Sequence, residues 1–123
     1  MRRIRVLLVE DNEVYRDTLA FLLGRHQDLE LVGAVATGAE AADASVDLDA
    51  DVVVIDLRLP DIGGAEAAAA VRRRSPGTPV VFLSASAGDD EQRAASSSSA
   101  TLVGKDEGIE ALLAAIRASA GGT

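Results

Sequence analysis

The sequence predicts an α/β domain built on a doubly wound, five-stranded parallel sheet, and three observations favour this fold. Short apolar runs alternate with helix-like segments along the whole chain of 123 residues. The apolar runs are continuous, as expected for parallel strands that are covered on both sides. Right-handed crossovers then put helices on both faces of the sheet. A chain of this length forms one domain with one core.

Five segments are predicted as strands. Four of them are clear apolar runs, and the second in chain order is weaker. In order they are Ile4–Val9, Leu29–Ala36, Val52–Ile55, Val80–Leu83 and Leu102–Val103. Only Tyr15, Phe21 and Phe82 are aromatic, so the core between these strands and their helices must be aliphatic and rich in alanine.

Helix-like segments separate the strands. Asn12 is suited to cap a helix that runs to about Gly24. Two further helices are predicted at Ala39–Ser45 and Ala65–Arg74. The last helix has the clearest period, with apolar residues at Ile109, Leu112, Leu113 and Ile116. One stretch is unusual, because residues 84–101 contain no valine, isoleucine, leucine, methionine or aromatic residue.

Composition excludes several classes of function. A net charge of −8 argues against direct binding of nucleic acid, which requires a basic face. The absence of cysteine removes disulfides, thiol catalysis and thiolate metal sites. No segment approaches the roughly 20 apolar residues of a membrane span, and the basic N-terminus has too short an apolar run for a signal peptide. We therefore expect a soluble cytoplasmic domain.

Polar side chains stand where the predicted strands end. Glu10 and Asp11 follow the first strand, Asp56 the third, Ser84 the fourth and Lys105 the fifth. Because the carboxyl ends of parallel strands lie at one edge of the sheet, we expect these side chains to converge. Three carboxylates brought together repel one another, and a divalent cation relieves the repulsion. Ligands that are all oxygen point to Mg²⁺.

This set of groups suits phosphoryl transfer. The carboxylate of Asp56 can attack phosphorus and form an acyl phosphate. A metal ion and Lys105 can neutralise charge on the equatorial oxygens, while the Ser84 hydroxyl donates a hydrogen bond to one of them. Lys105 is the only lysine of a chain that otherwise uses arginine, and a compact ammonium suits a small acyl phosphate.

Over essentially its whole length the chain resembles the receiver domain of bacterial two-component response regulators. "LLVEDN" matches the family's acidic pair, "DLRLPDIGG" its phosphoacceptor segment, "VVFLSAS" the strand with the switch hydroxyl and "LVGKD" the lysine motif. Pro60 and Gly64 follow Asp56 at the family's spacing. The sequences "DLRLP" and "KD" within these motifs are most similar to those of the subfamily that carries LuxR-type helix-turn-helix output domains.

The resemblance implies a flavodoxin-like fold with the strand order 2-1-3-4-5. The receiver domain would span residues 1–119, with residues 120–123 as a flexible end or the start of a linker. Asp56 is implied as the phosphoacceptor, with Ser84 and Lys105 as the other catalytic groups. The implied Mg²⁺ ligands are Glu10, Asp11, Asp56 and the backbone carbonyl of Arg58.

The implied partner is a sensor histidine kinase that presents phosphohistidine. The domain would promote its own phosphorylation and hydrolysis, and it would be a switch and not a metabolic enzyme. The resemblance leaves room for a C-terminal DNA-binding output domain in a longer protein and for a homodimer. It implies no direct contact with nucleic acid or membrane.

The chain departs from the family at two places. Leu102 stands three residues before Lys105, where the family usually has an aromatic residue that rotates inward upon phosphorylation. The preceding helix usually has apolar anchors and a final Gly-Ala pair, but here it reads "QRAASSSSAT" and is about one residue short. We therefore predict that the helix within residues 88–101 is short, irregular or mobile, most clearly at Ser96–Ser99.

Two alternatives stay open at this point. A phosphatase of the haloacid-dehalogenase type also uses an Asp nucleophile at a strand end, but it needs a second Asp two residues later, where this chain has Arg58. A receiver-like module could instead signal through protein contacts without phosphorylation. Leu102 and the serine run favour this second alternative, and the complete acidic pocket disfavours it.

Overall fold

The computed structural model describes residues 2–121. Its sheet has five strands in the order β2-β1-β3-β4-β5, which confirms the expected topology. All four strand pairings are parallel. The strands are β1 (Ile4–Val9), β2 (Leu29–Val35), β3 (Val52–Asp56), β4 (Val80–Ser84) and β5 (Thr101–Gly104).

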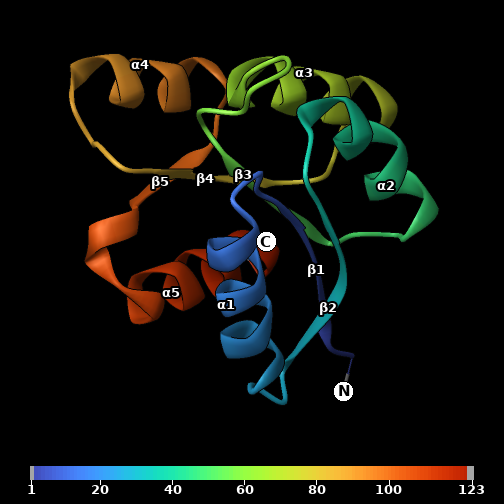
Figure 1. Cartoon of the computed structure of the whole chain (residues 1–123). Coiled ribbons are helices and arrows are strands. Elements are labelled where there is room, and N and C mark those ends of the chain that lie inside the picture. Colours follow the sequence, from blue (N-terminus) through green and yellow to red (C-terminus); the bar gives the residue numbers. More distant parts are fainter. Residues whose placement is uncertain (1, 122–123) are drawn as a thin grey trace.

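Helices cover both faces of this sheet (Figure 1). They are α1 (Glu13–Gly24), α2 (Ala41–Asp47), α3 (Gly64–Arg74), α4 (Asp89–Ser97) and α5 (Ile109–Ala120). One face packs against α1 and α5, and the other against α2, α3 and α4. Short 3₁₀ helices precede α2 (Gly38–Glu40) and α5 (Lys105–Glu107).

The two-sided packing explains why the strands have continuous apolar sequences. In β1, Val6 and Leu8 belong to the cluster under α1 and α5, while Leu7 and Val9 belong to the cluster under α2, α3 and α4. Every residue of β3 is buried, as is every residue of β4. Successive side chains of a strand point to opposite faces, so both faces need apolar residues. Among the buried residues of these two clusters, Phe82 is the only aromatic one.

Asn12 caps α1 as the sequence predicts. Its Oδ1 accepts a hydrogen bond of 2.9 Å from the backbone N–H of Tyr15, and the helix ends at Gly24 as expected. This bond satisfies one of the N–H groups that have no partner in the first turn. The cap therefore fixes the start of α1 directly after Glu10 and Asp11.

The serine-rich segment folds more regularly than the sequence suggests. The nine residues of α4 make it short, as predicted, but Ser96 and Ser97 are helical, so the predicted irregularity is wrong for these two residues. The helix closes through hydrogen bonds from Ser99 N–H to the Ser96 carbonyl and from Ala100 N–H to the Ala95 carbonyl. Ser99 has a φ of 51°, the left-handed conformation in which helices commonly place glycine.

The last helix extends slightly beyond the predicted domain end at residue 119. It runs through Ala120, and the N–H of Gly121 donates to the Arg117 carbonyl at 3.0 Å. Residues 122–123 of the predicted flexible end lie outside the described residues. Within residues 2–121, none of the helices is long and apolar enough to cross a membrane.

Candidate functional site

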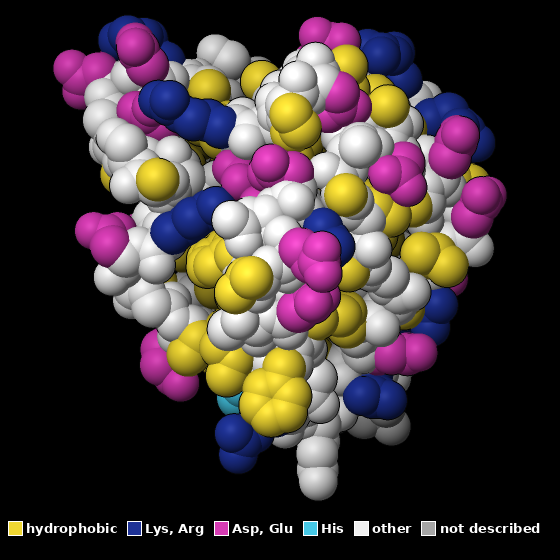
Figure 2. Space-filling model, viewed as in Figure 1, with side chains coloured by type: hydrophobic (Ala, Val, Ile, Leu, Met, Phe, Trp, Pro, Cys, Tyr) yellow, Lys and Arg dark blue, Asp and Glu magenta, His cyan; other side chains and the backbone are white. Residues whose placement is uncertain are grey.

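The residues predicted for the site meet at the carboxyl edge of the sheet. Asp56 and Ser84 are the last residues of β3 and β4, while Glu10 follows β1 and Lys105 follows β5. Glu10, Asp56 and Ser84 are buried, and Asp11 is exposed. Acidic side chains gather near the middle of the molecular face in Figure 2, with basic side chains beside them.

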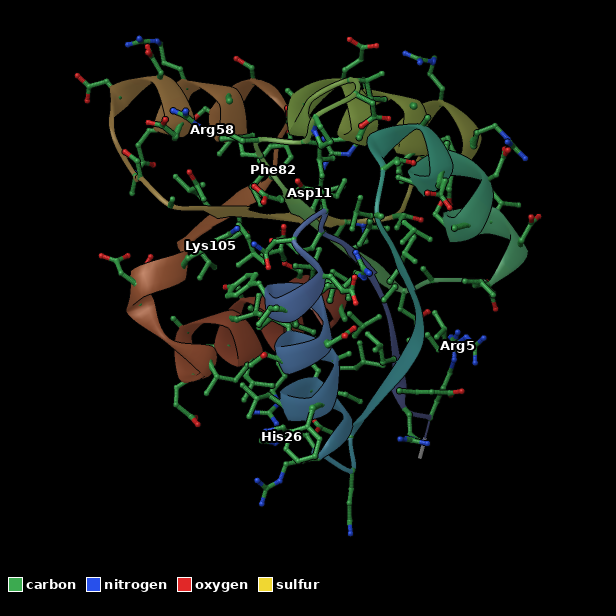
Figure 3. All side chains as sticks on the ribbon, in the orientation of Figure 1. Arg5, Asp11, His26, Arg58, Phe82 and Lys105 are labelled. Atoms are coloured by element: carbon green, nitrogen blue, oxygen red, sulfur yellow. The ribbon has the colours of Figure 1, made fainter. Side chains whose placement is uncertain are left out.

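Lys105 joins the two buried carboxylates. Its Nζ lies 2.9 Å from Glu10 Oε1 and 3.0 Å from Asp56 Oδ2. Figure 3 shows Asp11 and Lys105 approaching this region, while His26 lies at the far end of α1. These contacts bridge 95 and 49 residues of sequence, so they exist only in the folded chain.

The remaining carboxylate oxygens accept bonds from the backbone. Asn12 N–H donates to Glu10 Oε2 at 3.0 Å, and Arg58 N–H donates to Asp56 Oδ1 at 2.9 Å. Each oxygen of the two buried carboxylates therefore has one donor and keeps further acceptor capacity. That capacity is what a metal ion or a phosphoryl group requires.

Gly64 lets the loop after β3 fold back onto the strand end. Its N–H donates to the Leu57 carbonyl at 2.9 Å. A Cβ at this position would lie 2.6 Å from the Asp56 carbonyl oxygen and 2.6 Å from Leu57 Cα. Any larger residue would push the loop away, so Gly64 is needed to keep the backbone of Asp56 in place.

Glu10, Asp11 and Asp56 can share one metal ion. Each offers a carboxylate oxygen, and the three oxygens lie within 4.8 Å of one another. Desolvation raises the pKa of Glu10, and the hydrogen bond from Lys105 only partly offsets this effect. Burial lowers the pKa of Lys105, but its hydrogen bonds to Glu10 and Asp56 outweigh burial, so the pKa is raised overall. Lys105 is therefore a cation at neutral pH, and the all-oxygen donor set suits Mg²⁺.

Ser84 and Arg58 lie beside this pocket. The Ser84 Oγ accepts a hydrogen bond of 3.2 Å from Ser86 N–H, and β4 pairs Ser84 with Gly104, directly before Lys105. The Arg58 side chain points away toward α4 (Figure 3). There it forms an ion pair of 3.3 Å with Glu91. Arg58 therefore contributes its backbone to the pocket, while its side chain links the pocket's loop to α4.

Three contacts of this region were not predicted. Tyr15 presents its ring to Lys105, Glu91 pairs with Arg58, and Asp61 accepts hydrogen bonds from the N–H groups of Gly38 and Ala39. Asp61 follows a Pro in a loop, which is a weak signal for such a capping role. The Tyr15 and Glu91 contacts join separate helices to the site, and no local pattern could have revealed them.

The chain matches the response regulator receiver domain family over residues 6–117. It is 39% identical over 64 residues to the transcriptional regulatory protein LiaR of Bacillus subtilis, which is 52% of this chain and 30% of that protein. It is 35% identical over 66 residues to a protein-glutamate methylesterase/protein-glutamine glutaminase of Thermotoga maritima, which is 54% of this chain and 19% of that protein. The matched segments thus span less than a third of the length of these relatives.

Solved structures give the same result. The response regulator domain of Thermotoga maritima CheB superposes with a TM-score of 0.87 at 28% identity, covering 98% of both chains. A LuxR-family two-component response regulator from Aurantimonas sp. SI85-9A1 superposes with a TM-score of 0.91 at 27% identity, covering 98% of this chain and 86% of that one. The family match leaves the dehalogenase-type alternative without support. The chain belongs to the receiver domain family of two-component response regulators.

Proposed function

We propose that this receiver domain accepts a phosphoryl group on Asp56 and acts as a signalling switch. One observation carries the proposal: Lys105 Nζ contacts both Glu10 and Asp56, the two buried acids at the carboxyl edge of the sheet. A structural ion pair needs one acid, whereas this lysine contacts two buried acids, and these two belong to a cluster of three that share a potential metal position. The cluster is costly to assemble unless it binds a cation.

In the proposed reaction an Asp56 carboxylate oxygen attacks the phosphorus of a phosphohistidine. A P–O bond forms as the P–N bond breaks, and the imidazole leaves with the partner protein. Lys105 lies 3.0 Å from Asp56, so its ammonium is within reach of a phosphoryl oxygen without movement of the backbone. The Ser84 hydroxyl at the end of β4 would donate to a second phosphoryl oxygen.

Mg²⁺, when bound, would supply positive charge that offsets the charge of the phosphoryl oxygens. Its ligands would be Glu10, Asp11, Asp56 and the backbone carbonyl of Arg58. The chemistry of the donor set supports this assignment, because hard oxygen ligands and a partly open acidic pocket are what Mg²⁺ prefers. Asp11 is the exposed member, so it can bind the ion from the solvent side.

The switch would reset by hydrolysis at the same site. Water attacks the phosphorus, the acyl phosphate P–O bond breaks, and inorganic phosphate leaves with Asp56 restored as a carboxylate. The chain would thus catalyse only its own phosphorylation and dephosphorylation. A sensor histidine kinase is the proposed phosphodonor in the cytoplasm, and a DNA-binding output domain or a second copy of the domain is the proposed recipient of the signal.

Intact-mass measurement with acetyl phosphate tests this proposal. With Mg²⁺ we expect the mass gain of one phosphate, and with EDTA we expect none. Asp56→Asn should abolish the gain, whereas Asp89→Asn should keep it, because Asp89 is an exposed acid in the first turn of α4. A wild-type protein that gains no mass, or an Asp56→Asn variant that gains as much as wild type, would overturn the proposal.

A further inference from the structure

The ammonium of Lys105 has a third neighbour besides the two carboxylates. Its Nζ lies 4.5 Å from the centroid of the Tyr15 ring. A cation within about 6 Å of a ring centroid is attracted by the negative face of the ring. An ammonium has three N–H donors, and Glu10 and Asp56 take two of them. The Tyr15 ring therefore contacts the side of the ammonium that does not bind the carboxylates.

The backbone holds Tyr15 in this position. Its N–H donates to Asn12 Oδ1 at 2.9 Å, and Asn12 N–H donates in turn to Glu10 Oε2 at 3.0 Å. The ring also packs against the core cluster under α1 and α5. Tyr15 is thus tied through two hydrogen bonds to the same acid that binds Lys105.

Lys105 needs such a restraint. Its side chain is flexible, and a hollow of about 120 Å³ lies beside it, lined by residues of α1, β5 and α5. Tyr15, Leu19, Val103 and Ile109 are among the lining residues. Lys105 itself borders this hollow. Loss of the ring would enlarge the space beside the lysine stem and leave room for the ammonium to turn away from the carboxylates.

We propose that Tyr15 is a positioning residue that holds the ammonium of Lys105 toward the end of β3. The carboxylates of Glu10 and Asp56 must change partners when a metal ion and a phosphoryl group bind. The Tyr15 ring binds neither the metal ion nor the phosphoryl group, so its contact with Lys105 persists while the contacts of the two carboxylates change. The consequence for phosphorylation rests on the proposed function, but the contact itself does not.

The ring face and not the hydroxyl carries this role. Within residues 2–121 the Tyr15 hydroxyl forms no side-chain hydrogen bond, whereas the ring faces the ammonium. Phenylalanine would keep the ring face, and leucine would keep apolar volume without it. Tyr15→Phe is therefore the conservative variant, and Tyr15→Leu is the disruptive one.

Nuclear magnetic resonance tests the contact directly. Lys105 is the only lysine, so lysine-specific isotope labelling yields a single side-chain spin system. The ring current of Tyr15 should shift the terminal methylene and ammonium protons of Lys105 away from their free-lysine positions. We expect this shift to remain in Tyr15→Phe and to be lost in Tyr15→Leu. Phe21→Leu is the matched control, because Phe21 is an exposed aromatic residue of α1, and it should leave the Lys105 signals unchanged.

The rate of phosphorylation by acetyl phosphate tests the consequence. Tyr15→Leu should slow the reaction about three- to tenfold, the range expected for a partly desolvated cation–π contact, and Tyr15→Phe should restore the wild-type rate. If Tyr15→Leu keeps the wild-type chemical shifts of Lys105, the contact is refuted. If Tyr15→Leu loses these shifts but is phosphorylated at the wild-type rate, the positioning role is refuted. Failure of wild type to react would refute the proposed function instead, and the Lys105 shift would then decide whether Tyr15 holds the lysine.

Discussion

Lys105 Nζ donates to Asp56 Oδ2 at 3.0 Å, and the same nitrogen donates to Glu10 Oε1 at 2.9 Å. One cation thus serves two buried acids, and three carboxylates with one ammonium leave the pocket with a net negative charge. The fold buries two of these carboxylates, Glu10 and Asp56, so that little water remains to solvate them. The excess is the physical reason to expect a metal ion here, and that ion together with Lys105 would offset the charge of an incoming phosphoryl group.

Mg²⁺ should stabilise the folded chain, because only the folded state assembles Glu10, Asp11 and Asp56. If the Kd is on the order of 1 mM, about 10 mM Mg²⁺ adds roughly 1.4 kcal/mol to the free energy of unfolding. Thermal unfolding with Mg²⁺ or EDTA measures this gain. Asp11→Asn should reduce it, since Asp11 is the exposed ligand.

The stability gained from Mg²⁺ should also depend on pH. Desolvation raises the pKa of Glu10 in the folded state above its ordinary value of 4.5. Protonated Glu10 therefore adds to the stability of the folded state below pH 4.5, and this added stability is lost as pH rises through the raised pKa. Mg²⁺ needs the carboxylate form, so the gain in Tm should be larger at about pH 7.5 than at about pH 5. A Tm indifferent to Mg²⁺ at both values would favour a module that signals without phosphorylation.

Ser99→Gly should stabilise the protein. Ser99 has a φ of 51° at the end of α4, a conformation that costs roughly 1 kcal/mol for a residue with a Cβ and little for glycine. Glycine also loses more backbone entropy on folding, which offsets part of this relief, so denaturant unfolding should show a net gain of up to about 1 kcal/mol. Ser98→Gly is the control: its φ of −93° is ordinary, so glycine there should lower stability. Equal effects of the two variants would refute this account of the turn.

The amides of α4 should exchange with solvent far faster than those of Ile109–Ile116 in α5. Only Glu91 and Ala95 are buried in α4, whereas α5 buries Leu112, Leu113 and Ile116. Each large aliphatic side chain contributes about 1.5–3 kcal/mol through burial, and α4 has none. Hydrogen exchange of the unphosphorylated protein measures the difference. Equal protection of both helices would mean that contacts other than apolar burial hold α4.

Asp61 should stabilise the short 3₁₀ helix that precedes α2 (Gly38–Glu40) in a pH-dependent way. Its carboxylate accepts hydrogen bonds of 2.9 Å from Gly38 N–H and 2.8 Å from Ala39 N–H, and the bond from Gly38 is the main reason that its pKa is lowered from 3.8. This contribution is present above the unfolded pKa and is lost as pH falls through the lower folded value. Asp61→Asn should therefore lower the Tm at neutral pH.

The Tm difference between Asp61→Asn and wild type should shrink as pH falls below 3.8 and vanish once the folded carboxyl is protonated. Asp17→Asn, which changes an exposed acid of α1, should have little effect at any pH. If the Asp61 difference stayed constant down to strong acid, the carboxylate charge would not be its cause.

The sequence predicts the parts of this fold that depend on local pattern. The continuous apolar runs locate β1, β3 and β4 within one residue at each end, and Asn12 locates the start of α1. The convergence of Glu10, Asp56 and Lys105 follows from topology alone, because parallel strands end at a common edge. These features need no knowledge of how individual helices pack.

The parts that escaped prediction depend on contacts between elements. A run of serines gives no apolar stripe, yet α4 forms through Ser97, with Glu91 held at its first turn by Arg58 and a closing turn at Ser99. The sequence marks Tyr15 only as one of three aromatic residues, and the packing of α1 against the sheet is what brings its ring over Lys105. Leu102 is half-buried against the cluster under α4, a contact that its sequence position alone does not reveal.

Borohydride trapping after phosphorylation tests the central claim most directly, because it converts an aspartyl phosphate to homoserine at the modified residue. Trypsin separates the acids of the pocket: residues 6–16 carry Glu10 and Asp11, and residues 26–58 carry Asp56. With Mg²⁺ and acetyl phosphate we expect homoserine at position 56 alone, and none when EDTA replaces Mg²⁺. Reduction at Asp11, or at an acid outside the pocket, with Asp56 unchanged would contradict the assignment of Asp56 as the phosphoacceptor.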